Sequence, residues 1–193
     1  MLDIYLTIVL APLLGSVIVG LSGNRLGRKI SHSITILGVA ISTVLSIYVF
    51  NHHVLNDADI FNQNIYTWMQ IGGLNISVGF LVDNLTAVML VVVSFVSLMV
   101  HIYTIGYMHD DKGYTKFFSY ISLFTFAMFT LVISNNFMQL FFGWEAVGLV
   151  SYLLIGFWHH KESAIEANLK AFLVNRVGDF GFLLGIAFVL MFF

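Results

Sequence analysis

The sequence predicts an all-α integral membrane protein with six transmembrane helices and a β-hairpin in the outer loop between the second and third helices. Three observations predict this fold class. Hydrophobic residues make up 59% of the 193-residue chain and charged residues only 9%, whereas a soluble domain is roughly 25% charged. Several apolar runs approach the roughly 20 residues that a helix needs to cross the hydrocarbon core. The basic residues outside these runs fall only in alternate loops.

Six apolar runs qualify, or nearly qualify, as membrane-spanning helices. They cover residues 4–21, 30–50, 84–107, 117–133, 137–158 and 171–193. Pro12 lies inside the first run, and membrane helices accept proline. We therefore expect the first run to remain helical across the membrane.

The loops between these runs predict the orientation of the chain. Basic residues occur in the first, third and fifth loops, and the second and fourth loops contain none. These residues are Arg25, Arg28, Lys29, Lys112, Lys116, Lys161 and Lys170. The positive-inside rule places the three basic loops in the cytoplasm, so both termini are expected in the opposite compartment.

The second loop is the only long one, and its sequence predicts β-structure. Residues 74–82 alternate apolar and polar side chains, and they follow a second strand-like run, residues 65–71, and the pair Gly72-Gly73. This pattern predicts a β-hairpin with a two-residue turn on the outer face. Asp83 is expected to be the N-cap of the third helix.

Glu145 lies near the centre of the fifth apolar run. A charge near the bilayer centre costs at least about 2.5–3.5 kcal/mol on insertion scales, and such residues usually face a bundle interior or a wet cavity. Two interpretations are open: a structural carboxyl that is hydrogen-bonded to a neighbour, and a proton-relay or gating carboxylate. Gly148 shares its helix face and would let a neighbouring helix approach closely.

The sixth run carries Arg176 and Asp179, three residues apart on one helix face. Asp179 lies about 13 Å along the helix from Lys170, which places it deep in the membrane. The pair either neutralises itself and locks two helices together, or forms a hydrophilic relay with Glu145. Because two acids then share one base, one carboxylate needs a proton or a partner from outside this chain.

The composition also excludes several kinds of site. The chain has no cysteine, so it forms no disulfide, thiolate zinc site or cysteine-ligated iron–sulfur cluster. It has no phosphate-binding loop and no basic tract, so nucleotide and nucleic-acid binding are not expected. The histidine pairs 52–53 and 159–160 are adjacent in sequence, their side chains diverge, and no metal site is expected there. His101 is expected to be packed and hydrogen-bonded rather than to transfer protons.

Several stretches of the chain resemble a known family. They are residues 80–89, residues 113–129, residues 140–158 with the motif Gly143-Trp144-Glu145, and residues 170–182 with the motif Asn175-Arg176-Val177-Gly178-Asp179. In combination they resemble the chain L (antiporter-like subunit 5) family of NADH:quinone oxidoreductase, respiratory complex I, along the whole sequence. The large subunit of Mrp-type cation/proton antiporters shares these motifs, so the motifs do not separate the two families.

This resemblance implies a proton-translocating membrane subunit that couples quinone reduction to proton pumping. Glu145 matches the fifth-helix acid that faces a central lysine, and Arg176 and Asp179 match the sixth-helix motif. No cofactor is implied in this chain; NADH, FMN, iron–sulfur clusters and quinone would be bound by other subunits. The implied partners are the other membrane subunits of complex I, especially the neighbouring antiporter-like subunit, with the lipid bilayer and protons. A bacterial inner membrane is expected in preference to the mitochondrial one.

The resemblance also implies a division of the chain. Residues 1–116 would hold the first three helices with the outer hairpin, and residues 117–193 the first three helices of the antiporter-like repeat. The family's broken seventh helix with its lysine has no counterpart here, so we expect an N-terminal fragment that does not pump alone. A subunit of an Mrp-type antiporter and a non-transporting membrane scaffold are the alternatives.

Overall fold

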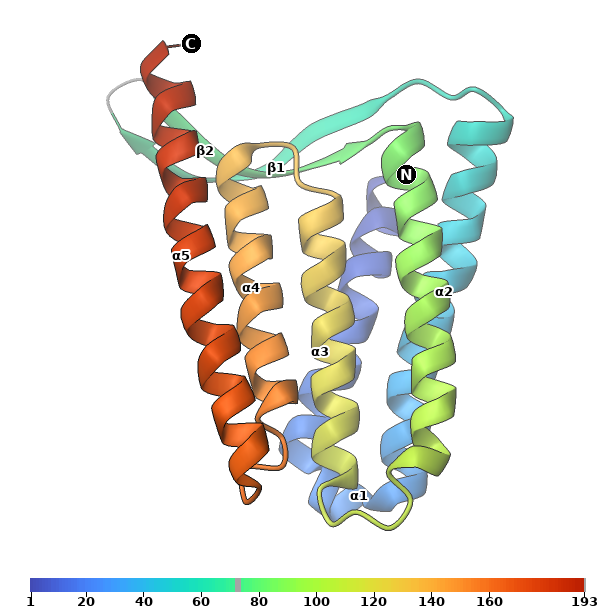
Figure 1. Cartoon of the computed structure of the whole chain (residues 1–193). Helices are drawn as coiled ribbons and strands as arrows, with labels where there is room; N and C mark the ends of the chain where they lie inside the picture. The colour runs from blue at the N-terminus through green and yellow to red at the C-terminus, as the bar shows by residue number, and fades with distance from the viewer. Residues whose placement is uncertain (72–73, 193) are drawn as a thin grey trace.

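The computed structural model describes residues 1–71 and 74–192, which contain six helical segments long and apolar enough to cross a membrane. These segments are Leu2–Gly23, Arg25–Leu55, Asn84–Tyr107, Tyr114–Val132, Phe137–Ile155 and Glu162–Phe192. They stand side by side as a bundle, and a two-stranded hairpin lies across one end of it (Figure 1). The predicted all-α membrane fold, with a hairpin between the second and third spans, is confirmed.

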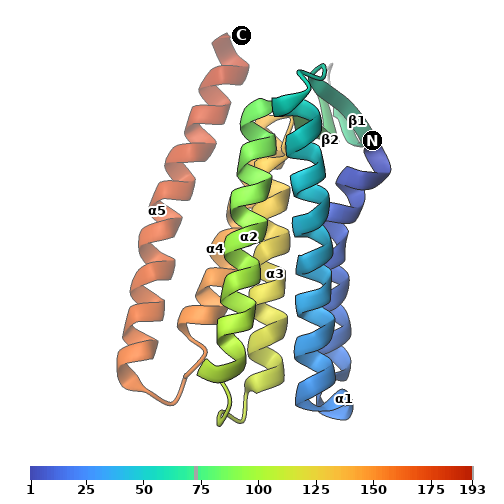
Figure 2. The same ribbon diagram turned by 90° about the vertical axis from the view of Figure 1, so that its right-hand side faces the viewer.

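Helix α1 (Leu2–Phe50) contains the first two spans and folds back on itself at Gly27. Gly27 has a φ of 77°, in the left-handed region that glycine enters without steric cost. The two arms then lie side by side (Figure 2). A Cβ added to Gly38 would lie 2.9 Å from the carbonyl oxygen of Ala11, so the small residue lets the two backbones approach closely.

Pro12 is accommodated by hydroxyl groups from its neighbours. Proline has no N–H, so the carbonyl of Ile8 one turn earlier has no helical donor. Ser42 on the second arm of α1 donates its hydroxyl to that carbonyl over 2.8 Å. Ser122, on helix α3 (Tyr114–Val132), donates to the carbonyl of Pro12 itself over 2.8 Å. The helix therefore accepts proline, as expected, because side-chain hydroxyls hydrogen-bond to its backbone carbonyls.

The hairpin follows a short π-helical turn at the end of α1. Its elements are η1 (Asn51–Leu55), β1 (Phe61–Ile71) and β2 (Leu74–Val82). The strands are antiparallel, with Phe61 opposite Val82 and a register shift between Asn64 and Tyr66, a bulge of the kind that bends a strand. Strand β1 begins four residues earlier than the sequence pattern indicated. The predicted two-residue turn at residues 72–73 lies outside the described residues.

Hydrogen bonds from backbone N–H groups of β2 attach the hairpin to the end of α3 and to the start of helix α4 (Phe137–Ile155). The N–H of Gly79 donates to Oε1 of Gln139 over 2.9 Å. The N–H of Leu81 donates to the carbonyl of Ile133 over 3.0 Å. The hairpin therefore rests on the end of α3 and on the start of α4, the helix that carries Glu145.

Helix α2 (Asn84–Tyr107) begins where the sequence predicted. Oδ1 of Asp83 accepts a hydrogen bond of 2.7 Å from the N–H of Thr86, which is the N-cap arrangement. This hydrogen bond favours the charged carboxylate and holds the pKa of Asp83 below its usual value.

The three basic loops meet at the end of the bundle opposite the hairpin, and both termini lie at the hairpin end (Figure 1). Arg28 donates hydrogen bonds from its guanidinium to the backbone carbonyls of His109 and Asp111. The side chain of Asp111 accepts a bond of 2.9 Å from the indole of Trp158. The loops therefore form one connected cap, and the side of the membrane that it faces stays a prediction.

Helix α5 (Glu162–Phe192) lies at the edge of the bundle and packs on α4 (Figure 2). Most of its apolar side chains are exposed, including Phe172, Val177 and Phe180. The charged residue Asp179, by contrast, is buried. The contact between α4 and α5 therefore decides the surroundings of the charged residues.

Candidate functional site

Helix α4 is fixed both at its start and near its middle. Asn136 is the N-cap, and its side-chain oxygen accepts the N–H of Gln139 over 2.8 Å. A Cβ added to Gly143 would lie 2.7 Å from Cα of Leu131 on α3. The absence of a side chain at Gly143 therefore lets α4 lie directly against the backbone of α3.

Glu145 lies in the middle of α4, about 12–15 Å from either end at 1.5 Å per residue. Its Oε2 accepts a hydrogen bond from Nη1 of Arg176 on α5. The side chain of Glu145 is 25% exposed and that of Arg176 is 36% exposed. Glu145 has no partner on its own helix, and α5 supplies one as a half-buried ion pair.

Asp179 lies one turn beyond Arg176, with its Oδ2 3.3 Å from Nε of the arginine. This contact is the i,i+3 pair that the spacing predicted. It lacks hydrogen-bond geometry, and Oδ2 has no hydrogen-bond partner within residues 1–71 and 74–192. The side chain of Asp179 is only 8% exposed. One guanidinium therefore lies between two carboxylates, and one carboxylate oxygen remains free to accept.

Trp144 is a fourth member of the site, which the sequence analysis did not single out. Its indole Nε1 donates a hydrogen bond of 2.9 Å to Oδ1 of Asp179. Its ring meets the ring of Phe182 nearly perpendicularly, with centroids 6.4 Å apart. The available signal was a tryptophan beside an intramembrane acid, because an indole N–H only donates and needs an acceptor in apolar surroundings.

The structure thus brings Glu145, Arg176 and Asp179 together, although they were predicted on two separate helices. With both acids ionised, two carboxylates and one guanidinium leave one net negative charge. The guanidinium also lies 5.0 Å from the centroid of Phe172, within the range of a cation–π contact. The one guanidinium is thus within reach of both carboxylates.

Gly148 plays a different part from the one expected. A Cβ there would lie 3.5 Å from Nη2 of Arg176, an ordinary contact with a side chain. We expected a neighbouring helix to approach closely at Gly148, and this is wrong. The close backbone approach of α4 occurs at Gly143 instead. The helix face was assigned correctly, since Gly148 does lie beside the partner of Glu145.

The histidines lie apart from this site. His101 is fully buried in α2, and its Nδ1 lies 2.8 Å from the carbonyl of Ser97, as expected for a packed and hydrogen-bonded residue. His53 is buried at the hairpin end of the bundle, with Nε2 2.8 Å from the hydroxyl of Tyr5. Among the described residues, no group of three or more His, Asp and Glu side chains is arranged to hold a metal ion.

Two family models match the chain. Residues 68–118 match the model described as NADH-ubiquinone oxidoreductase (complex I), chain 5 N-terminus. Residues 134–193 match the model described as NADH:quinone oxidoreductase/Mrp antiporter, TM. The second match contains all four residues of the site.

Individual relatives match over nearly the whole chain. NADH-quinone oxidoreductase subunit L of Neisseria meningitidis serogroup B is 65% identical over 193 residues, which are 100% of this chain and 29% of that protein. NADH-ubiquinone oxidoreductase chain 5 of Dictyostelium discoideum is 44% identical over 189 residues, 98% of this chain and 28% of that protein. The chain therefore spans less than a third of the length of these relatives.

The fold also has a counterpart among solved structures. A chain of the membrane-bound sulfane sulfur reductase, an archaeal respiratory membrane complex, superposes with a TM-score of 0.78 at 17% sequence identity. The match covers 95% of this chain and 36% of that one, and at this identity it concerns the fold alone. From the family models and the relatives, the chain belongs to the subunit L (chain 5) family of NADH:quinone oxidoreductase, a family of antiporter-like membrane proteins.

Proposed function

We propose that this chain takes part in proton translocation by an NADH:quinone oxidoreductase, in which quinone reduction drives proton pumping. The observation that supports this most directly is the cluster of Glu145, Arg176 and Asp179 at the centre of α4 and α5. Charged groups at membrane depth are costly and commonly mark ion or proton pathways. The similarity to subunit L over the whole chain supports the same assignment.

The geometry suggests how the cluster would act. While Glu145 is ionised, it holds Nη1 of Arg176. A proton arriving on Glu145 removes that negative charge, and the guanidinium then turns toward Asp179, whose Oδ2 is already 3.3 Å from Nε. Trp144 keeps Asp179 in position through this exchange. Protonation of one acid is thereby coupled to the position of a positive charge.

The wider assignment follows from the relatives. NADH, FMN, iron–sulfur clusters and quinone would be bound by other subunits, and the partners of this chain would be the other membrane subunits, especially the neighbouring antiporter-like one. A bacterial inner membrane is the proposed location, because the Neisseria and Rickettsia relatives are bacterial proteins.

The test is Glu145→Gln in the complete complex, reconstituted in vesicles, with NADH oxidation and internal pH measured together. The amide keeps the size of the side chain but cannot exchange a proton, and the lost charged hydrogen bond costs about 1.5–3 kcal/mol. We expect proton translocation to fall roughly ten-fold or more, since 1.4 kcal/mol is a factor of ten. Glu166→Gln is the matched control, because Glu166 is exposed near the start of α5. Equal pumping by wild type and Glu145→Gln, in fully assembled complex, contradicts the proposal.

A second candidate is a subunit of an Mrp-type cation/proton antiporter, because the family model that covers residues 134–193 includes both kinds of protein. Such a subunit would exchange protons for a cation without NADH. Vesicles that hold the assembled complex distinguish the two: an imposed sodium gradient that drives proton flux in the absence of NADH favours the antiporter. Assembly without any effect of Glu145→Gln on either flux favours a non-transporting scaffold.

A further inference from the structure

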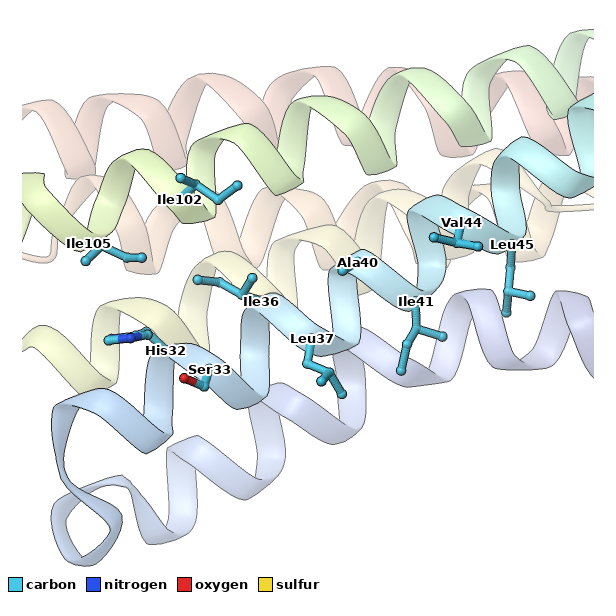
Figure 3. A pocket seen from close by; sticks show the side chains of 10 residues that line it. All are labelled: His32, Ser33, Ile36, Leu37, Ala40, Ile41, Val44, Leu45, Ile102 and Ile105. Carbon is cyan, nitrogen blue, oxygen red and sulfur yellow. The ribbon is translucent and has the colours of Figure 1, made fainter.

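A groove follows the second arm of α1 on the side that faces α2 (Figure 3). It has a volume of about 770 Å³, and His32 and Ser33 line it near the turn at Gly27. Its apolar lining includes Leu37, Ile41, Val44, Leu45, Ile102 and Ile105. A second hollow of about 320 Å³ shares Ser33 and Leu37 with it and has Lys29 in its wall. The two hollows together, from Lys29 to Leu45, are called the α1–α2 groove below.

The groove is long enough to hold an acyl chain. From Ser33 to Leu45 the helix rises about 18 Å at 1.5 Å per residue. Half of a hydrocarbon core about 30 Å thick, the depth of one leaflet, is about 15 Å. The groove therefore begins at the end of the bundle where the basic loops lie and extends somewhat beyond the depth of one leaflet.

The lining favours a flexible chain over a packed helix. Membrane helices approach each other through small residues, and the opposite face of the same α1 arm shows this, with Gly38 and Ser42 against Ala11 and Ile8 of the first arm. Apart from Ser33 and Ala40, the α1–α2 groove is lined by larger side chains, most of them branched, such as Ile41. Such a face offers an acyl chain an apolar hollow and lacks the run of small residues through which membrane helices approach each other.

A positive charge stands where the groove reaches the end of the bundle. Lys29 is exposed and forms no ion pair within the part of the chain that the structure describes. The neighbouring Arg28, by contrast, already donates to the carbonyls of His109 and Asp111. A free ammonium at the level of the lipid headgroups is complementary to a phosphate, and basic pockets between membrane helices bind anionic headgroups.

We propose that the α1–α2 groove binds an anionic phospholipid, with an acyl chain along the branched side chains and the phosphate at Lys29. The inference does not depend on the proposed function of the cluster at Glu145. Moving an acyl chain from the bilayer into the groove gains little free energy, because lipid tails are as apolar as leucine. Selectivity therefore comes from the headgroup, and one basic residue near the surface contributes about five-fold, equivalent to about 1 kcal/mol.

The proposal is tested by photocrosslinking in the complete complex, held in nanodiscs of phosphatidylcholine. The probe is a small fraction of phosphatidylglycerol with a diazirine in its acyl chain, and crosslinked peptides are mapped by mass spectrometry. We expect crosslinks concentrated on residues 36–45 and 102–105. Unlabelled phosphatidylglycerol should compete about five-fold better than unlabelled phosphatidylcholine. Crosslinks spread evenly over the exposed helix faces, or absent from the groove, overturn the proposal.

Two variants separate the headgroup from the tail. Lys29→Gln should remove the preference for phosphatidylglycerol, whereas Lys112→Gln, at an exposed lysine of another loop at the same end, should retain it. Ile41→Trp should fill the groove and reduce crosslinking of the labelled lipid, whichever unlabelled lipid is present. Ile41 is 40% exposed, so the larger side chain does not enter the core. Equal effects of Lys29→Gln and Lys112→Gln, or unchanged crosslinking in Ile41→Trp, contradict the proposal.

Discussion

The indole of Trp144 donates a hydrogen bond of 2.9 Å to the carboxylate of Asp179. The next residue of α4, Glu145, accepts from Arg176, so two consecutive residues hold the same stretch of α5. Helix α5 is otherwise largely exposed at the edge of the bundle. These two polar links, together with aromatic contacts such as that of Phe141 with Phe182, join α5 to the middle of α4.

Trp144→Phe should weaken the link to Asp179 without assembly being lost. Phenylalanine keeps the ring against Phe182 and removes only the N–H donor. Because the site is partly exposed to solvent, we take the hydrogen bond to the charged carboxylate as worth about 1 kcal/mol. We therefore expect proton translocation in the complete complex to fall about five-fold. Trp68→Phe, where the ring packs on Phe142 beneath the hairpin, is the matched control. A loss of equal size in the control would contradict the role given to Trp144.

Asp179→Asn should reduce translocation less than Glu145→Gln does. The amide oxygen of asparagine can still accept from Trp144, so the attachment of α5 survives. Glutamine at position 145 instead leaves Arg176 without the carboxylate that holds its Nη1. Pumping assays on both variants give the ranking, with assembly checked by native electrophoresis. Equal and complete losses from intact complexes would contradict it.

Gly143→Ala should push α4 away from α3. The added Cβ would lie 2.7 Å from Cα of Leu131, which is backbone and cannot rotate aside. Overpacking of this kind costs about 1–3 kcal/mol, measurable as a lower melting temperature in detergent. Gly106→Ala is the control, because a Cβ there meets nothing within 4 Å among the described residues. An equal shift in melting temperature for both variants would show that close packing at Gly143 is unimportant.

Cysteine labelling tests the predicted orientation. Asp110→Cys and Ser163→Cys should resist an impermeant maleimide applied from outside, whereas Asn56→Cys should react. All three positions are exposed and none carries a basic residue, so the charges that set the orientation stay unchanged. Gly27 and Gly113 lie in the same basic loops but are unsuitable for a cysteine. Gly27 has a φ of 77°, and a Cβ at Gly113 would lie 2.5 Å from the ring of Phe157. Permeabilised membranes, in which every site should react, are the control.

The loop cap should loosen only in acid. The Trp158 indole and then the Gly113 N–H donate to Asp111 and hold the pKa of that carboxyl below its usual value of 3.8. Because the folded pKa is depressed, the stabilisation is fully present above about pH 4 and is lost as the pH falls through the folded value. Asp111 should therefore keep the cap intact from pH 8 to pH 5 and release Trp158 below about pH 4.

The fluorescence of Trp158 measures this transition in a background with Trp68→Phe and Trp144→Phe, since the chain has three tryptophans. Asp111→Asn should abolish the transition below pH 4, because the amide does not titrate. Asp110→Asn, at an exposed neighbouring acid, should leave it unchanged. A fluorescence transition that persists in Asp111→Asn would assign it to another group.

The sequence by itself determined the membrane class, the six spans, the hairpin between the second and third spans, and the N-cap at Asp83. Each of these depends on local composition or periodicity: runs of apolar residues, alternation over residues 74–82, and an acid directly before a helix. Glu145, Arg176 and Asp179 could also be singled out from the sequence, because ionised side chains are rare at membrane depth. The motifs around Glu145 and Asp179 identified a group that includes complex I and Mrp antiporter subunits, and similarity over the whole chain identified the family.

Only the tertiary structure decided which groups meet. The pairing of Arg176 with Glu145, the hydrogen bond from Trp144, and the close approach at Gly143 rather than Gly148 depend on how α4 is rotated and placed against α3 and α5. The donors that satisfy the carbonyls of Ile8 and Pro12 likewise come from residues distant in sequence, Ser42 and Ser122. Helix periodicity determines which residues share a face but carries no information on which neighbouring helix that face meets, because in a membrane lipid and protein are equally apolar partners.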